Sequence, residues 1–273
     1  MFGLEDRVIL VTGGNRGIGA AVVTMLANHG AKVAYTYRSH PNPELNALAL
    51  KADVTDPQSM EAVAEEVDAN LGPVYGVVAN AGITNDARSS RMSYEKWATV
   101  IDTNLNGVYN TLAPIVPGMY ERGEGALVFI SSVVGEQGNI GQTNYAATKA
   151  GLIGMAKTLG LEGARYGVRA NVVCPGFTET DMVKAIPEDV KQKIYRTIPC
   201  AASPAKKKSP GASPFSCRPS PAGLHHRRHV EHQRRAAHMT SLLSRLQPLQ
   251  GHGGVVHVDG GGDAGGTAGA AGL

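Results

Sequence analysis

The sequence predicts a single α/β domain in which helices cover both faces of a doubly wound parallel sheet. Short β-rich apolar runs alternate with longer segments of helical period from Val8 to about Pro199, and such alternation is typical of parallel sheets. The length of 273 residues suits one large core. Hydrophobic residues make up 42% of the chain and charged residues 18%, as in ordinary globular proteins.

The expected strands and helices follow one another along the chain. The strands are expected at Val8–Val11, Val33–Tyr37, Val74–Ala79, Leu127–Ile130, Ala170–Cys174 and Val255–Val258. The helices are expected at Ile18–Asn28, Met60–Asn70, Trp97–Ile115 and Asn144–Tyr166.

The pattern of strands and helices breaks after Pro199. Residues 200–238 carry Pro, Ser, Arg and His without apolar periodicity, and residues 200–250 hold nine Lys or Arg against one Glu. We therefore expect three parts. Residues 1–199 form the main domain, residues 200–250 are an atypical basic segment that is disordered or arises from a reading-frame error, and residues 251–273 hold the last strand and a flexible glycine-rich tail.

Composition disfavours several function classes. No apolar run approaches the ~18 residues of a membrane-spanning helix, and no targeting signal precedes the first strand, so a cytoplasmic protein without a membrane partner is expected. Basic charge confined to one stretch is not typical of a nucleic-acid-binding domain. Cys174, Cys200 and Cys217 lack paired or metal-like spacing. Nothing orders the four histidines between His225 and His232 as ligands, so no metal site is expected.

A glycine-rich turn follows the first expected strand and opens a helix. Glycines let such a turn tighten and let its backbone approach a pyrophosphate, whose charge is favoured at the helix N-terminus. The strand before the turn and the helix after it are the context that this motif requires. We expect cofactor contacts from Gly13, Asn15, Arg16, Gly17, Ile18 and Gly19.

The end of the second strand favours NADPH over NADH. NAD-selective folds usually place an acid here for the ribose hydroxyl, and none stands between Thr36 and Ser39. Arg38, with Arg16, offers forked cations for a 2′-phosphate; a solvated surface arginine is the alternative. Asp53 and Val54 follow a further short strand, the third along the chain, which lies between Tyr37 and the helix expected at Met60–Asn70. They are expected to face the adenine, although Asp53 could equally serve the turn into the next helix.

Ser132, Tyr145 and Lys149 form the candidate catalytic set. Tyr145 and Lys149 are four residues apart on an expected helix, so they share a face, and we expect the lysine cation to lower the pKa of the phenol. A tyrosine of this kind can act as a general acid. Ser132 follows the Leu127–Ile130 strand, where its hydroxyl could hold a carbonyl oxygen. A helical Tyr-x-x-x-Lys alone is usually a surface pair, so the hypothesis depends on all three residues behind a dinucleotide turn.

Over residues 4–199 the chain resembles the short-chain dehydrogenases/reductases, which implies a Rossmann-type fold. Within this family it looks most like 3-oxoacyl-acyl carrier protein reductases of type II fatty-acid synthesis, and some stretches also look like acetoacetyl-CoA reductases. The residues that carry the resemblance are Thr12-Gly13-x-x-x-Gly17-x-Gly19, Asn80-Ala81-Gly82, Asn104 within TNLNG, Ser132, Tyr145-x-x-x-Lys149 and Pro175-Gly176.

The resemblance implies further roles. Asn104 would kink its helix and hold a water in a proton relay, the alternative being a helix-interior asparagine that is satisfied locally. Tyr145 and Lys149 would also contact the cofactor, Lys149 at the nicotinamide ribose. Two loops would line the cofactor through Asn80, Ala81 and Gly82, and through Pro175, Gly176, Thr178 and Thr180.

The expected activity is the NADPH-dependent reduction of a 3-oxoacyl thioester, carried on acyl carrier protein, to the 3-hydroxyacyl thioester. One alternative is the same chemistry on acetoacetyl-CoA or another ketone. The other is an NADPH-binding protein that is catalytically impaired, because the acidic, apolar helix usual after Pro199 is not recognisable. The family resemblance implies a homotetramer, and the altered region usually builds the subunit interface and closes the substrate pocket.

Overall fold

The structure, a computed structural model, describes residues 3–176 and 255–258. The described residues belong to one compact unit, which comprises Met1–Gly176 and Ala237–Val258. Thr178, Thr180, the basic segment at 200–250 and the tail after residue 258 lie outside the described residues, so the expectations for them stay predictions.

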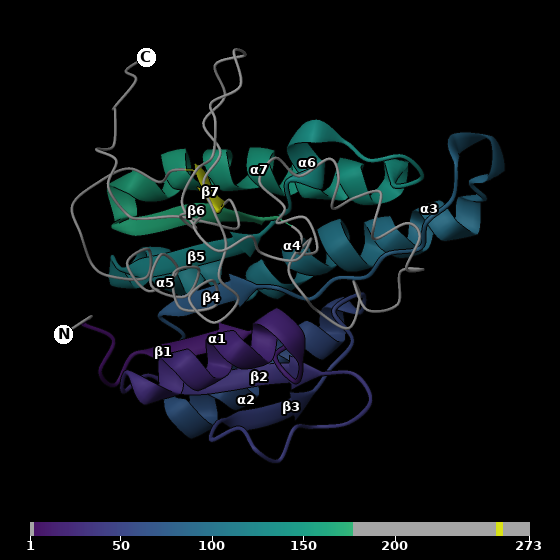
Figure 1. The fold of residues 1–273 in the computed structure, drawn as a ribbon. Helices are drawn as coiled ribbons and strands as arrows, with labels where there is room; N and C mark the ends of the chain where they lie inside the picture. The colour runs from purple at the N-terminus through teal and green to yellow at the C-terminus, as the bar shows by residue number, and fades with distance from the viewer. Residues whose placement is uncertain (1–2, 177–254, 259–273) are drawn as a thin grey trace, which may run out of the picture. The chain divides into compact units, whose positions relative to one another are not determined.

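A seven-stranded parallel sheet forms the centre of this unit (Figure 1). Its order is β3-β2-β1-β4-β5-β6-β7, so the direction of winding reverses between β1 and β4. This confirms the predicted doubly wound α/β fold. The strands are β1 (Val8–Val11), β2 (Lys32–Tyr37), β3 (Leu48–Lys51), β4 (Gly76–Ala79), β5 (Gly125–Ile130), β6 (Val168–Pro175) and β7 (Val255–Val258).

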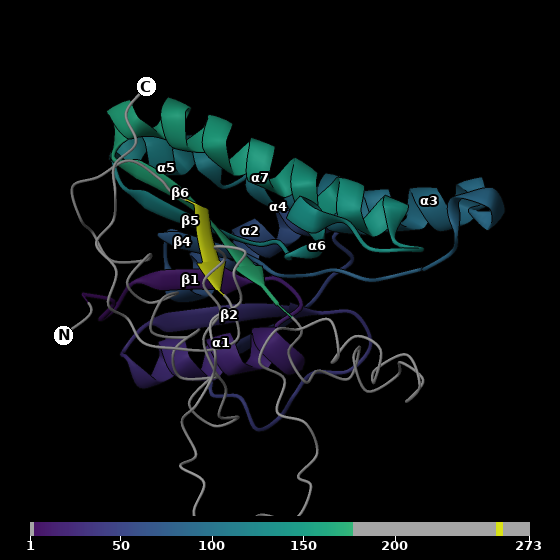
Figure 2. The ribbon, with the colours of Figure 1, turned by 45° about the horizontal axis from the view of Figure 1, so that its top comes forward.

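Alternate strand residues face two apolar layers, because successive side chains of a strand point to opposite faces of the sheet. Ile9 on β1 packs in the layer that contains Leu26 of α1 (Gly17–Asn28). Its neighbour Leu10 packs in the layer that contains Met60 of α2 (Pro57–Leu71) and Leu152 of α7 (Thr143–Gly163). Figure 2 shows α1 on one face of the sheet and α2 and α7 on the other.

The helix predicted over Trp97–Ile115 is wrong as one continuous helix. The structure has α3 (Tyr94–Ile101), a π-helical turn η2 (Asp102–Asn106) and α4 (Gly107–Leu112) in its place. The reason is that a buried asparagine within η2, Asn104, bonds to another segment of the chain. Three short elements were not predicted: η1 (Ser89–Arg91), α5 (Val116–Arg122) and α6 (Val134–Gln137). The last residues of the helix predicted over Asn144–Tyr166 form a 3-10 turn, η3 (Ala164–Tyr166).

The connection between β2 and β3 is unusually short for parallel neighbours. The two strands pair in parallel, with Ala34 opposite Leu48, yet residues 38–47 between them contain only turns and bends. A parallel connection usually has a dozen or more residues and a helix. Other contacts must therefore hold this connection, which begins with the predicted cofactor-selecting residue Arg38.

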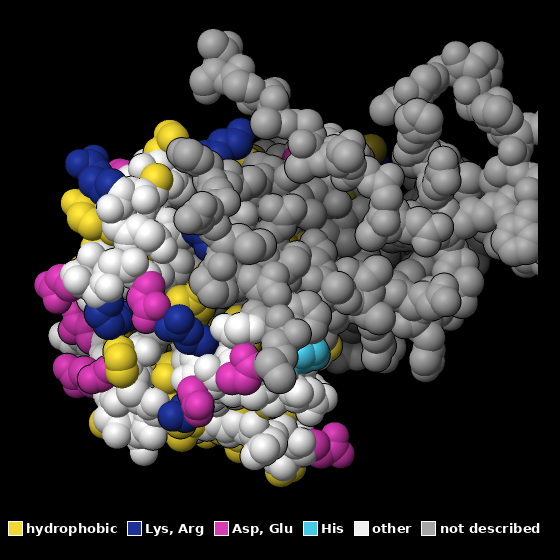
Figure 3. Space-filling view, turned by 90° about the vertical axis from the view of Figure 1, so that its left-hand side faces the viewer, with side chains coloured by type: hydrophobic (Ala, Val, Ile, Leu, Met, Phe, Trp, Pro, Cys, Tyr) yellow, Lys and Arg dark blue, Asp and Glu magenta, His cyan; other side chains and the backbone are white. Residues whose placement is uncertain are grey.

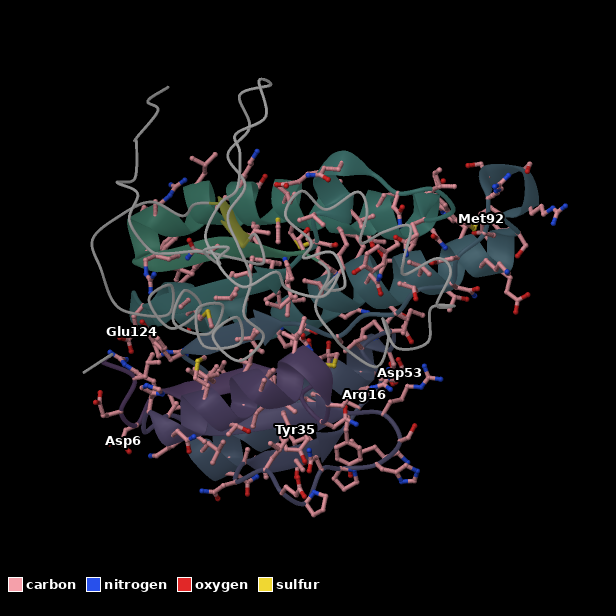
Figure 4. The ribbon with its side chains drawn as sticks, in the orientation of Figure 1. Asp6, Arg16, Tyr35, Asp53, Met92 and Glu124 are labelled. Carbon is pink, nitrogen blue, oxygen red and sulfur yellow. The ribbon has the colours of Figure 1, made fainter. Side chains whose placement is uncertain are left out.

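An ion pair closes the amino ends of the central strands. The Arg7 Nη1 atom donates to both Glu124 carboxylate oxygens at 2.7 and 2.8 Å, and the guanidinium lies 4.3 Å from the centre of the Tyr75 ring. Figure 4 labels Glu124 at the opposite side of the view from Arg16 and Asp53.

On the described surface in Figure 3, Lys and Arg lie interspersed with Asp and Glu. None of the helices within the described ranges has the length and apolar character to cross a membrane.

Candidate functional site

The candidate site residues follow the carboxyl ends of the central strands. The glycine turn follows β1, Asn80 to Gly82 follow β4, Ser132 follows β5, and Pro175 ends β6. In open parallel sheets ligands bind at this edge, where the strand order reverses. The fold therefore gathers segments that are far apart in the sequence at the expected binding edge.

The glycine turn has the geometry of an anion cradle. Gly13 and Gly17 have φ of +62° and +55°, which favours glycine. A Cβ on Gly19 would lie 2.3 Å from the Gly13 carbonyl oxygen, so no side chain fits there. No side chain caps the start of α1, and among the described residues no atom lies within 4 Å of a Cβ built on Gly17. An uncapped helix N-terminus with free space beside Gly17 fits a dinucleotide pyrophosphate.

Thr12 and Asn80 hold the glycine turn against the loop after β4. The Thr12 Oγ1 atom accepts from the main-chain N–H groups of Asn80 and Ala81 at 3.0 and 3.1 Å. The Asn80 Nδ2 atom donates to the carbonyl oxygens of Thr12 and Gly13 at 2.9 and 3.0 Å. The structure thus gives Asn80 and Ala81 a positioning contact. Thr12 was not among the candidate site residues. A polar residue directly after an apolar strand is a pattern in the sequence that could have identified it as one.

Asp53 serves the turn into α2, the alternative that the sequence left open. Its Oδ1 atom accepts from the main-chain N–H and the hydroxyl of Thr55 at 3.0 and 2.7 Å. These bonds lower the pKa of Asp53, burial opposes them, and the positive charge of Arg38 lowers it further. The neighbouring Val54 is buried, and its carbonyl oxygen accepts from Asn110 Nδ2 at 3.0 Å. Contact of Asp53 and Val54 with an adenine stays a prediction.

Ser132, Tyr145 and Lys149 meet at the start of α7. The ammonium nitrogen of Lys149 lies 5.5 Å from the centre of the Tyr145 ring and donates to the Ile130 carbonyl oxygen at 2.7 Å. A hydrogen bond joins the Ser132 and Tyr145 side chains. The Ser131 hydroxyl, which sequence reasoning missed, donates to the Lys149 carbonyl oxygen at 2.7 Å. The three predicted residues therefore form one group, in which Ser132 and Lys149 are buried and Tyr145 is half-buried.

Burial controls the ionisation of this group. It raises the pKa of the Tyr145 phenol; the Ser132 hydrogen bond opposes that rise, and the negative charge of Asp86 adds to it. The predicted lowering of the Tyr145 pKa by Lys149 is therefore wrong, because loss of solvent outweighs the favourable contacts of the phenolate. Burial also lowers the pKa of Lys149 from 10.5 to about 8, and the neighbouring Cys174 partly opposes this.

Asn104 joins the same group from the π-helical turn. Its Oδ1 atom accepts from the Ile83 N–H at 2.8 Å, and its Nδ2 atom donates to the Ile83 carbonyl oxygen at 2.9 Å and the Thr148 hydroxyl at 3.4 Å. These partners are 21 and 44 residues away in sequence, so the asparagine is not satisfied locally. A Cβ on Gly82 would lie 3.3 Å from Asn104 Oδ1 and 3.6 Å from Lys149 Nζ.

The end of β6 borders the loop that carries Ser132. The Pro175 carbonyl oxygen accepts from the Val133 N–H at 3.2 Å. Gly176 is the last residue of the described range 3–176, and apart from its chain neighbours no described atom lies within 4 Å of a Cβ built on it. Pro175 and Gly176 thus lie at the predicted edge, whereas contacts by Thr178 and Thr180 stay predictions.

Comparison with known proteins gives a consistent assignment. Residues 7–191 match the family described as short chain dehydrogenase. An acetoacetyl-CoA reductase of Synechocystis sp. is 56% identical over 197 residues, which cover 72% of this chain and 82% of that protein. The 3-oxoacyl-[acyl-carrier-protein] reductase FabG of Escherichia coli is 43% identical over 202 residues, which cover 71% of this chain and 83% of that protein. Reductases of this family use nicotinamide cofactors, and this chain belongs to the short-chain dehydrogenase family of oxidoreductases.

Proposed function

We propose that this chain uses NADPH to reduce the keto group of a 3-oxoacyl thioester to the 3-hydroxyacyl thioester. The observation that carries the proposal is the group of Ser132, Tyr145, Lys149 and Asn104 at the carboxyl edge of the sheet. The glycine turn follows β1 at the same edge, with β4 between β1 and the strand that precedes Ser132. A proton donor beside a dinucleotide turn is the arrangement that carbonyl reduction needs.

The residues divide the chemistry between them. NADPH supplies the hydride when bound. The Tyr145 phenol is protonated at neutral pH, so it can donate a proton to the substrate oxygen. Ser132 would donate a hydrogen bond to the same oxygen as negative charge develops there. Lys149, as a cation, would hold the cofactor ribose beside Tyr145.

The cofactor would bind along the carboxyl edge. The first N–H groups of α1, from Gly17 to Gly19, would bind the pyrophosphate. The guanidinium groups of Arg16 and Arg38 would bind the 2′-phosphate. Other contacts would come from Gly13, Asn15, Asp53, Val54, Asn80, Ala81, Gly82, Tyr145, Pro175, Gly176, Thr178 and Thr180.

The comparisons favour two candidate substrates. The 56% identity to an acetoacetyl-CoA reductase favours acetoacetyl-CoA as the first substrate to test. The 43% identity to FabG favours a 3-oxoacyl group on acyl carrier protein, the substrate expected from the sequence, as the second. Both substrates present the same keto group two carbons from a thioester, so the residues around Tyr145 serve either.

The decisive experiment follows NADPH oxidation with acetoacetyl-CoA and with acetoacetyl-acyl carrier protein. Turnover of either thioester supports the proposal, and the ratio of the two kcat/KM values identifies the carrier. A chain that binds NADPH but turns over neither thioester would instead be the catalytically impaired binding protein that the unusual C-terminal region suggests.

Arg38→Asp tests the choice of cofactor. The substitution replaces attraction to a 2′-phosphate by repulsion, so we expect the Kd of NADPH to rise at least ~30-fold, while that of NADH changes less than ~3-fold. Fluorescence titration of both cofactors measures this, with the exposed Arg165→Asp as the control. Equal weakening of the two cofactors would count against Arg38 as the selecting residue.

A further inference from the structure

We infer that Tyr35 is a positioning residue for NADPH selection, because its buried hydroxyl fixes the connection that carries Arg38 against the turn that carries Arg16. The inference rests on the proposed use of NADPH. Tyr35 itself lies inside β2 and is fully buried, so its effect on the cofactor passes through other residues.

The connection between β2 and β3 lacks the usual source of rigidity. Residues 38–47 form no helix, so no ladder of helical hydrogen bonds fixes the backbone that follows Arg38. Arginine binds a phosphate with two N–H groups in a fixed fork. Such a contact tolerates little displacement, so the connection needs another anchor.

Asn42 is that anchor, and each of its four polar groups has a partner. Its N–H donates to the Tyr35 hydroxyl oxygen at 3.0 Å, and its carbonyl oxygen accepts from the same hydroxyl at 3.0 Å. Its Nδ2 atom donates to the Asn15 carbonyl oxygen at 3.2 Å, and its Oδ1 atom accepts from the Glu44 N–H at 3.0 Å. One tyrosine hydroxyl thus satisfies both main-chain groups of Asn42.

The same contacts reach the glycine turn. Asn15, in that turn, accepts from Asn42 and donates from its Nδ2 atom to the His40 carbonyl oxygen at 3.2 Å. A Cβ on Gly14 would lie 2.4 Å from the Tyr35 Cβ, so the tyrosine also packs directly against the turn. Arg16 follows Asn15 in sequence, and Arg38 precedes His40 by two residues. Figure 4 labels Tyr35 and Arg16.

Loss of the Tyr35 hydroxyl should therefore act on cofactor choice. Tyr35→Phe keeps the ring in the core but leaves the N–H and carbonyl groups of Asn42 without this partner, and unpaired groups that are shielded from water are unfavourable. The connection then shifts to find new partners, and Arg38 moves with it. NADH has no 2′-phosphate, so its binding should change little.

The test measures the Kd of NADPH and NADH for the full chain by fluorescence titration. We expect Tyr35→Phe to raise the NADPH Kd about tenfold and the NADH Kd less than about twofold. Hydrogen exchange of residues 38–47 should become faster without any cofactor present. The matched control is Tyr37→Phe, because the Tyr37 hydroxyl makes no hydrogen bond within residues 3–176; it should leave both Kd values unchanged.

A double-mutant cycle separates positioning from simple loss of stability. In an Arg38→Ala background, Tyr35→Phe should no longer change the ratio of the two Kd values, since both substitutions remove the same contact. Asn42→Ala provides a second variant should Tyr35→Phe fail to fold, and it should shift the ratio in the same direction. Equal weakening of NADPH and NADH, or additive effects with Arg38→Ala, would overturn the inference. A wild-type chain without preference for NADPH would overturn the proposed cofactor, and this inference with it.

Discussion

Tyr145 illustrates how burial and charge compete at a single residue. Its side chain is half-buried, and Asp86, whose Oδ2 atom accepts from Gln142 Nε2 at 2.9 Å, adds negative charge nearby. Both effects raise the pKa of Tyr145, against the Ser132 hydrogen bond. The protonated form is the one that a proton donor needs, but a higher pKa also makes the phenol a weaker acid, and the Ser132 hydrogen bond opposes that rise.

Tyr145→Phe tests this role. Only the transferable proton and its hydrogen bond are lost, so kcat for the thioester should fall at least ~10²-fold, while the Kd of NADPH should stay within ~2-fold. Steady-state assays and fluorescence titration measure the two quantities. The exposed Tyr109→Phe serves as the control, and retention of most activity in Tyr145→Phe would rule out Tyr145 as the donor.

Lys149 should make stability depend on pH. Burial lowers its folded pKa from 10.5 to about 8, so between these values the unfolded chain binds more protons than the folded one. The free energy of unfolding should therefore rise with pH through this window and gain nothing more from Lys149 above it. Urea unfolding at several pH values, compared between the wild-type chain and Lys149→Met, measures this contribution. Identical pH profiles for the two chains would contradict it.

Among the elements, η2 is the one that a single side chain shapes. Asn104 makes three hydrogen bonds to Ile83 and Thr148, and these replace the regular helical pattern by a π turn. Such turns often occur at functional sites. The turn and α3 lie beside α7, which carries Tyr145 and Lys149.

Asn104→Ala and Asn106→Ala form a matched pair within η2. Asn104 is buried, so its loss leaves the main-chain groups of Ile83 unpaired and should lower the free energy of unfolding by ~1–3 kcal/mol. Asn106 is exposed and bonds to Asp102, so its loss should cost less than ~0.5 kcal/mol. Denaturant unfolding measures both values, and kcat should fall only for Asn104→Ala. Equal effects would show that η2 does not depend on Asn104.

For the whole molecule, the sheet joins a strand from near the end of the sequence to the domain core. β7 pairs with β6 in parallel over four residues, from Val172 opposite Val255 to Pro175 opposite Val258. β6 also carries Pro175 at the candidate site, so this pairing supports the site from the side.

The division into residues 1–199, 200–250 and 251–273 remains our proposal from composition. The homotetramer, which the family resemblance implies, and the cytoplasmic location also remain proposals.

A truncation that ends at residue 251 tests the contribution of β7. It removes the strand and leaves the outer edge of β6 without this partner, so the free energy of unfolding should fall by ~1 kcal/mol for each ladder hydrogen bond lost. The control ends at residue 262 and retains β7. Urea unfolding compares the two chains. The same midpoint for both would show that β7 contributes nothing to stability.

The sequence by itself determined the sheet and most of the candidate site. Alternation of apolar strands and amphipathic helices is a local pattern, so it predicted β1, β2, β4, β5, β6 and β7, and glycines at fixed spacing predicted the turn into α1. Tyr145 and Lys149 share a helix face because four residues make about one turn. These features depend on neighbours in the sequence.

Only the tertiary structure decided the features that depend on distant partners. Asn104 breaks its helix because Ile83 lies beside it, and Asn42 holds a short connection because Tyr35 lies beneath it. Burial likewise reversed the expected pKa shift of Tyr145. Hydrogen bonds and loss of solvent depend on which segments the fold places together, and no local pattern of residues records that.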